Sequence, residues 1–83
     1  MTVEEKKAAY LIMWKGMLTD YTLIKRNTEY CPFIVAWGFN EEDYTWGQGH
    51  YFNDYSSALW FLLDKEKEAI EEKMEEIGDD IEI

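Results

Sequence analysis

Scarce cysteine and the absence of a long apolar run narrow the classes of fold open to this chain. Cys31 is the only cysteine among 83 residues, which excludes a disulfide-stapled scaffold. The longest uninterrupted apolar run covers residues 8–14, whereas a helix needs about 20 apolar residues to cross a bilayer. The opening residues, Thr2 to Glu5, are not those of a secretory signal peptide. The sequence therefore predicts a cytoplasmic protein without a membrane-spanning helix.

Basic residues are also scarce. The chain has 8 Lys plus Arg against 18 Asp plus Glu, a formal net charge of −10. Most of this charge lies in residues 55–83. Because contacts to phosphates need a basic surface, we expect no direct binding to nucleic acid and no binding to an anionic membrane. A basic protein is the partner that the charge favours.

Residues that could carry chemistry are few and scattered. His50 is the only histidine, and no nucleophile or set of metal ligands accompanies it in the sequence. The acidic residues lack the alternating spacing of a calcium-binding loop. Gly47 and Gly49 lack the third glycine of a dinucleotide-binding loop. We therefore expect a non-catalytic protein with no cofactor and no bound metal.

Aromatic residues, by contrast, are abundant. The chain has four Trp, six Tyr and four Phe, and each such side chain can bury about 150–250 Å². This supply of large apolar groups predicts a packed core rather than a disordered chain. The length allows one domain over residues 1–83, with disorder as an alternative for the tail at 79–83.

Apolar periodicity predicts a helix near each end of the chain. Thr2 and Glu5 have the spacing of a capping box, and the apolar residues that follow recur at intervals of three and four, which predicts a helix over residues 3–18. A second apolar stripe predicts a long helix over residues 56–77, ending where Gly78 can adopt a left-handed conformation. The stripe consists of Leu59, Leu63, Ile70, Met74 and Ile77, and is interrupted by Glu66.

Between the predicted helices, three runs rich in β-forming residues predict strands at 21–26, 33–39 and 44–52. Their connections are short enough for antiparallel hairpins. The predicted fold class is therefore α+β, with the order α-β-β-β-α and a three-stranded antiparallel meander packed by the long C-terminal helix.

Glycines interrupt the aromatic third strand. Gly47 and Gly49 predict a bulged or twisted strand in which neighbouring aromatic side chains pack closely. The alternative is an exposed aromatic binding surface that includes Trp46 and Tyr51, because such side chains are common interface anchors.

The segment Gly49-His50-Tyr51-Phe52, followed by a helix with Ala58, resembles the strand end and helix of AP2-like and integrase-arm DNA-binding modules. This resemblance implies a three-stranded sheet packed by a helix. Those modules read DNA from a basic sheet face, whereas the predicted sheet offers only Lys25 and Arg26. We therefore do not expect their function here.

The acidic residues of the C-terminal helix are the leading candidate site, because carboxylates spaced along a helix can imitate a row of phosphates and engage Arg and Lys. The row consists of Glu68, Glu71, Glu72, Glu75, Glu76, Asp79 and Asp80, with Glu41, Glu42, Asp43, Trp46 and Tyr51 as secondary contacts. In size, acidity and single-domain plan the chain resembles phage-encoded anti-CRISPR and anti-restriction proteins. This resemblance implies an inhibitor that blocks a basic nucleic-acid-binding enzyme.

A protein-interaction module is the alternative function. Its contact would be the aromatic face of the sheet or the apolar stripe of the C-terminal helix, which could also form a homodimer. The acidic face of that helix would then serve only for solvation.

Overall fold

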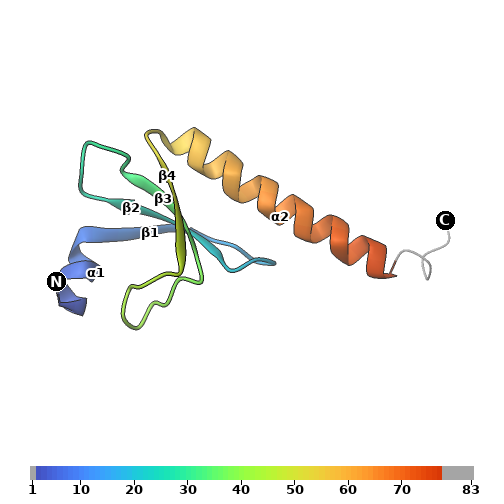
Figure 1. Cartoon of the computed structure of the whole chain (residues 1–83), viewed down its shortest axis with the longest axis horizontal. Helices are drawn as coiled ribbons and strands as arrows, with labels where there is room; N and C mark the ends of the chain where they lie inside the picture. Colours follow the sequence, from blue (N-terminus) through green and yellow to red (C-terminus); the bar gives the residue numbers. More distant parts are fainter. Residues whose placement is uncertain (1, 78–83) are drawn as a thin grey trace.

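Two helices and one four-stranded sheet make up the fold in a computed structural model that describes residues 2–77 (Figure 1). The tail predicted at 79–83 lies outside these residues. The elements are α1 (Val3–Ala9), β1 (Tyr10–Lys15), β2 (Tyr21–Arg26), β3 (Phe33–Trp37), β4 (Gln48–Phe52) and α2 (Tyr55–Ile77). The strands pair antiparallel in the order β1-β2-β3-β4. The α+β class is as predicted, but the meander has one strand more than expected.

The extra strand comes from the region predicted as the first helix. That helix begins as expected, because the Thr2 hydroxyl accepts a hydrogen bond from the Glu5 N–H at 3.2 Å. It ends at Ala9, and β1 follows directly at Tyr10. The prediction of helix over residues 10–18 was therefore wrong.

A β-bulge explains why β1 carries a helix-like pattern. Ile12 pairs with Ile24 while Trp14 pairs with Leu23, so the register shifts at Met13. In a regular strand, residues two apart share a face. Here the extra residue places Ile12 and Trp14 on opposite faces, and apolar residues no longer alternate along the strand.

The other strands lie within the predicted ranges: β2 has the predicted bounds, whereas β3 ends at Trp37 instead of residue 39 and β4 begins at Gln48 instead of residue 44. β4 pairs with β3 in continuous register, so no bulge occurs among its residues. Gly49 nevertheless admits close aromatic packing. A methyl group there would lie 3.0 Å from Trp46 Nε1 and 3.2 Å from Tyr51 Cε1. The short contacts explain why this strand position holds a residue without a side chain.

The sheet is covered on both faces. On one face, Leu23 and Val35 pack against Ala58 and Leu62 of α2, and all four are buried. On the other face, the buried residues are covered by aromatic and aliphatic side chains from β1 and the β3–β4 connection. These buried residues are Ile24, Ile34 and Ala36, and the covering side chains are Ile12, Phe39 and Trp46.

Helix α2 begins beside Asp54, whose carboxylate accepts a hydrogen bond from the Ser57 N–H at 2.9 Å. This bond and the Ser57 hydroxyl lower the pKa of Asp54 from its ordinary value. The first turns of α2 pack on β2, β3 and β4, and the rest of the helix extends beyond the sheet (Figure 1). Neither helix in residues 2–77 is long and apolar enough to cross a membrane.

Candidate functional site

Four glutamates of the predicted row lie exposed on the outer part of α2: Glu68, Glu71, Glu72 and Glu75. With a rise of 1.5 Å per residue, they span about 10 Å of the helix axis, or one carboxylate per roughly 3.5 Å. One strand of DNA carries a phosphate per about 3.4 Å of axis. The spacing of the carboxylates along this segment is therefore similar to that of the phosphates in one nucleic-acid strand, while the exposed Lys73 within the segment lowers its net negative charge.

Two of these glutamates are in weak ion pairs. Lys65 Nζ lies 3.6 Å from Glu68 Oε2, and Lys67 Nζ lies 4.0 Å from Glu71 Oε1. Exposed pairs of this kind contribute about 0.2–1 kcal/mol. They reduce the local negative charge without fixing the carboxylates, which stay accessible to a stronger cationic partner.

The remaining members of the predicted row are not described to the same extent. Glu76 belongs to α2, but its side chain is outside the described set. Asp79 and Asp80 lie outside residues 2–77. Their part in the row remains a prediction.

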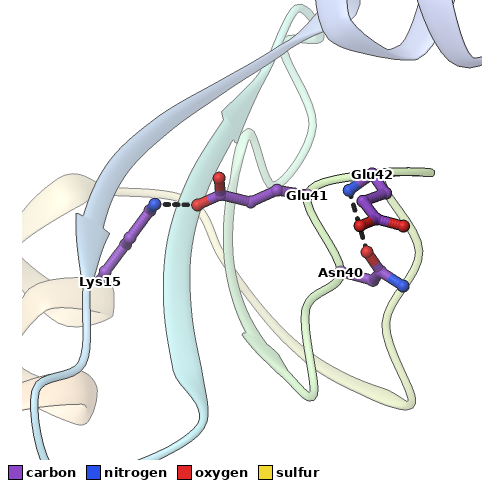
Figure 2. Close-up of polar contacts among 4 residues, drawn as sticks. All are labelled: Lys15, Asn40, Glu41 and Glu42. Carbon is purple, nitrogen blue, oxygen red and sulfur yellow. Dashed lines mark hydrogen bonds and ion pairs between the residues drawn. The ribbon is translucent and has the colours of Figure 1, made fainter.

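The secondary acidic residues hold the β3–β4 connection together instead. Glu41 forms an ion pair with Lys15, and the Glu42 N–H donates to Asn40 Oδ1 at 2.9 Å (Figure 2). The Asp43 carboxylate accepts from the N–H and the hydroxyl of Thr45, at 3.2 and 2.7 Å. In Figure 1 this connection lies below the sheet, away from the outer part of α2. The fold therefore does not bring the loop acids to the helical row.

The two secondary aromatic residues differ in their surroundings. Trp46 packs edge-on against Tyr10 and stacks on Phe39, with ring centroids 5.7 and 6.1 Å apart. It serves as a cover for the sheet. Tyr51 is half exposed, and the guanidinium of Arg26 lies over its ring at 5.1 Å from the centroid, so part of the ring is already covered.

The lone histidine and cysteine sit in packing contacts. The His50 ring lies 4.4 Å from that of Phe61 on α2. Cys31 has its N–H and its thiol 3.1 and 3.3 Å from Asn53 Oδ1. Among residues 2–77, no group of three or more His, Cys, Asp or Glu side chains could hold a metal ion.

The structure also shows an apolar groove that the sequence did not reveal. It has a volume of about 410 Å³ and lies between the β1–β2 turn and α2. Met17 is 91% exposed at its edge, and four other lining side chains are 44–49% exposed. These four are Trp14, Leu18, Leu63 and Ile70. We call this feature the α2 groove.

Glu66 fixes the shape of the α2 groove. Its carboxylate accepts hydrogen bonds from the backbone N–H groups of Met17 and Leu18, the latter at 3.1 and 3.2 Å. Burial raises the pKa of Glu66, but these N–H donors outweigh it and hold the pKa below its ordinary value. A single carboxylate inside an apolar stripe needs such donors. The presence of Glu66 within the apolar stripe therefore indicated that hydrogen-bond donors from another part of the chain contact its carboxylate.

Comparisons with models of protein families, with curated proteins and with solved structures found no match to this chain.

Proposed function

We propose that this protein is a non-catalytic inhibitor that binds a basic nucleic-acid-binding protein in place of the nucleic acid. The main support is the exposed row at Glu68, Glu71, Glu72 and Glu75, whose carboxylate spacing is close to the phosphate spacing of a nucleic-acid strand. The row lies on the part of α2 that extends beyond the sheet (Figure 1), where a concave basic surface can approach it. The net charge of −10 adds long-range attraction to a basic partner.

The test compares two variants that remove equal charge. Glu68→Gln, Glu72→Gln and Glu75→Gln together neutralise the row, while Glu4→Gln, Asp20→Asn and Glu29→Gln neutralise exposed acids that belong to neither the row nor its secondary contacts. Each tagged protein is used to capture partners from a nuclease-treated lysate of the source organism and is eluted in rising salt. We expect the wild type and the second variant to retain a basic nucleic-acid-binding protein that the first variant loses. Added DNA or RNA should compete for the captured protein.

Equal capture by both variants would contradict the proposal, as would a captured protein that nucleic acid does not displace. Salt gives a further criterion. An interface made of ion pairs weakens steeply as ionic strength rises, because exposed charges are screened within about 8 Å at physiological salt.

The α2 groove favours a second candidate function, a protein-interaction module. Contiguous exposed apolar side chains mark contact surfaces in many proteins. Met17, Leu63 and Ile70 provide such a surface beside the acidic row. A partner held there should resist salt, in contrast to one held by the glutamates.

A further inference from the structure

The α2 groove continues along the helix as an apolar stripe. Leu63 and Ile70 line the groove, and Met74, which is 61% exposed, extends the stripe past its end. Exposed single apolar residues are common on protein surfaces, whereas several in one concave surface are not. This arrangement provides a track for an elongated apolar partner.

An acidic edge runs along one side of that track. Each apolar residue is followed directly by an exposed acid, in the pairs Leu63-Asp64, Ile70-Glu71 and Met74-Glu75. Successive residues in a helix are rotated by about 100°, so the three carboxylates lie on the same side of the stripe. Lys67 also lies on this side and pairs with Glu71. The edge still carries more negative than positive charge.

From this juxtaposition we infer that the α2 groove binds an amphipathic helix of a partner protein. Apolar side chains of that helix enter the groove, and its Lys or Arg residues face Asp64, Glu71 and Glu75. The inference rests on the second candidate function and adds the chemistry of the partner. A helix laid in an apolar groove is a common mode of recognition. A second copy of this chain is a poorer occupant, because it brings a further net charge of −10.

The probe for this inference is a synthetic peptide of about 18 residues, made of Leu and Lys with the leucines at helical spacing. Two other peptides serve as comparisons: a scrambled one of the same composition, and an amphipathic one with Glu in place of Lys. Binding is measured by calorimetry at about 0.15 M salt. We expect the Leu/Lys helix to bind at least about tenfold more tightly than either comparison peptide. In methyl spectra, Met17 and Met74 should shift more than Met13, which does not line the groove.

A matched pair of variants locates the site. Leu63→Ser with Ile70→Ser should weaken peptide binding about tenfold. Trp60→Ser removes an apolar side chain of α2 that is 72% exposed and outside the groove, and should leave binding unchanged. Circular dichroism checks that each variant keeps its fold.

Three outcomes would overturn the inference. If the Leu/Glu helix binds as tightly as the Leu/Lys helix, the groove is a docking site but its basic preference is wrong. If the scrambled peptide binds equally, or the groove variant binds as the wild type does, neither the docking site nor its preference stands. If the free protein sediments as a dimer and Ile70→Ser makes it monomeric, the occupant is a second copy.

Discussion

The two halves of α2 differ in how far their apolar side chains are buried against the rest of the molecule. In the inner half, Ala58 and Leu62 are buried against Leu23 and Val35 of the sheet. In the outer half, Ile70 and Met74 are 46% and 61% exposed, and the glutamates around them face solvent. Packing of an apolar face is the main source of helix stability in proteins. The inner half is therefore part of the core, whereas the side chains of the outer half are available for binding.

The largest expected effect is on the free energy of unfolding. One substitution in each half of α2 tests whether only the inner half belongs to the core. Leu62→Ala removes a side chain that is 1% exposed and should lower the free energy of unfolding by about 2–4 kcal/mol. Met74→Ala should change it by less than about 0.5 kcal/mol. Urea denaturation measures both. Similar losses in the two variants would show that the outer half is packed in solution.

A second test compares added rather than removed volume. Gly49→Ala introduces a methyl group 3.0 Å from Trp46 Nε1 and should destabilise the protein by about 1–2 kcal/mol. Ala69→Leu adds a larger group to the outer half of α2, where we expect a change below about 0.5 kcal/mol. Thermal unfolding followed by near-ultraviolet dichroism reports both changes. A neutral Gly49→Ala would mean that the aromatic cover of the sheet shifts freely.

The smallest effect concerns Glu66, which joins the β1–β2 turn to α2. Because its folded-state pKa lies below its ordinary value, the ionised carboxylate stabilises the fold above the ordinary pKa. This contribution is lost as pH falls through the folded-state pKa. Glu66→Gln should cost about 1 kcal/mol at neutral pH. The difference from wild type should shrink as pH drops below about 4.3.

Stability curves at several pH values measure this difference, with Glu75→Gln as an exposed control. A gap between wild type and Glu66→Gln that stays constant down to acid pH would show that the hydrogen bonds to the turn do not depend on the charge.

The sequence predicted those helices that short-range patterns mark, such as a capping box or a periodic apolar stripe. Thr2 and Glu5 marked the start of α1, and the stripe from Leu59 to Ile77 marked the extent of α2. The bulge at Met13 hid β1, because the pairing of Trp14 with Leu23 depends on a partner strand that the local pattern does not contain.

The same limit applied to the binding surfaces. The glutamates of α2 could be placed on a common helix from sequence, since their spacing is local. The α2 groove could not, because Met17 and Glu66 are 49 residues apart and meet only after the helix has packed on the sheet. Whether Glu41 joins the helical row likewise depended on the position of its loop.

The strand order β1-β2-β3-β4 has a consequence for how the chain folds. Each strand pairs with its neighbour in sequence, so each hairpin closes only a short loop and loses little chain entropy. Pairing between strands adjacent in sequence is local and favours rapid formation of the sheet. The sheet can form one hairpin at a time, and the outer half of α2, which contributes little to the core, can stay unattached until the end without slowing it.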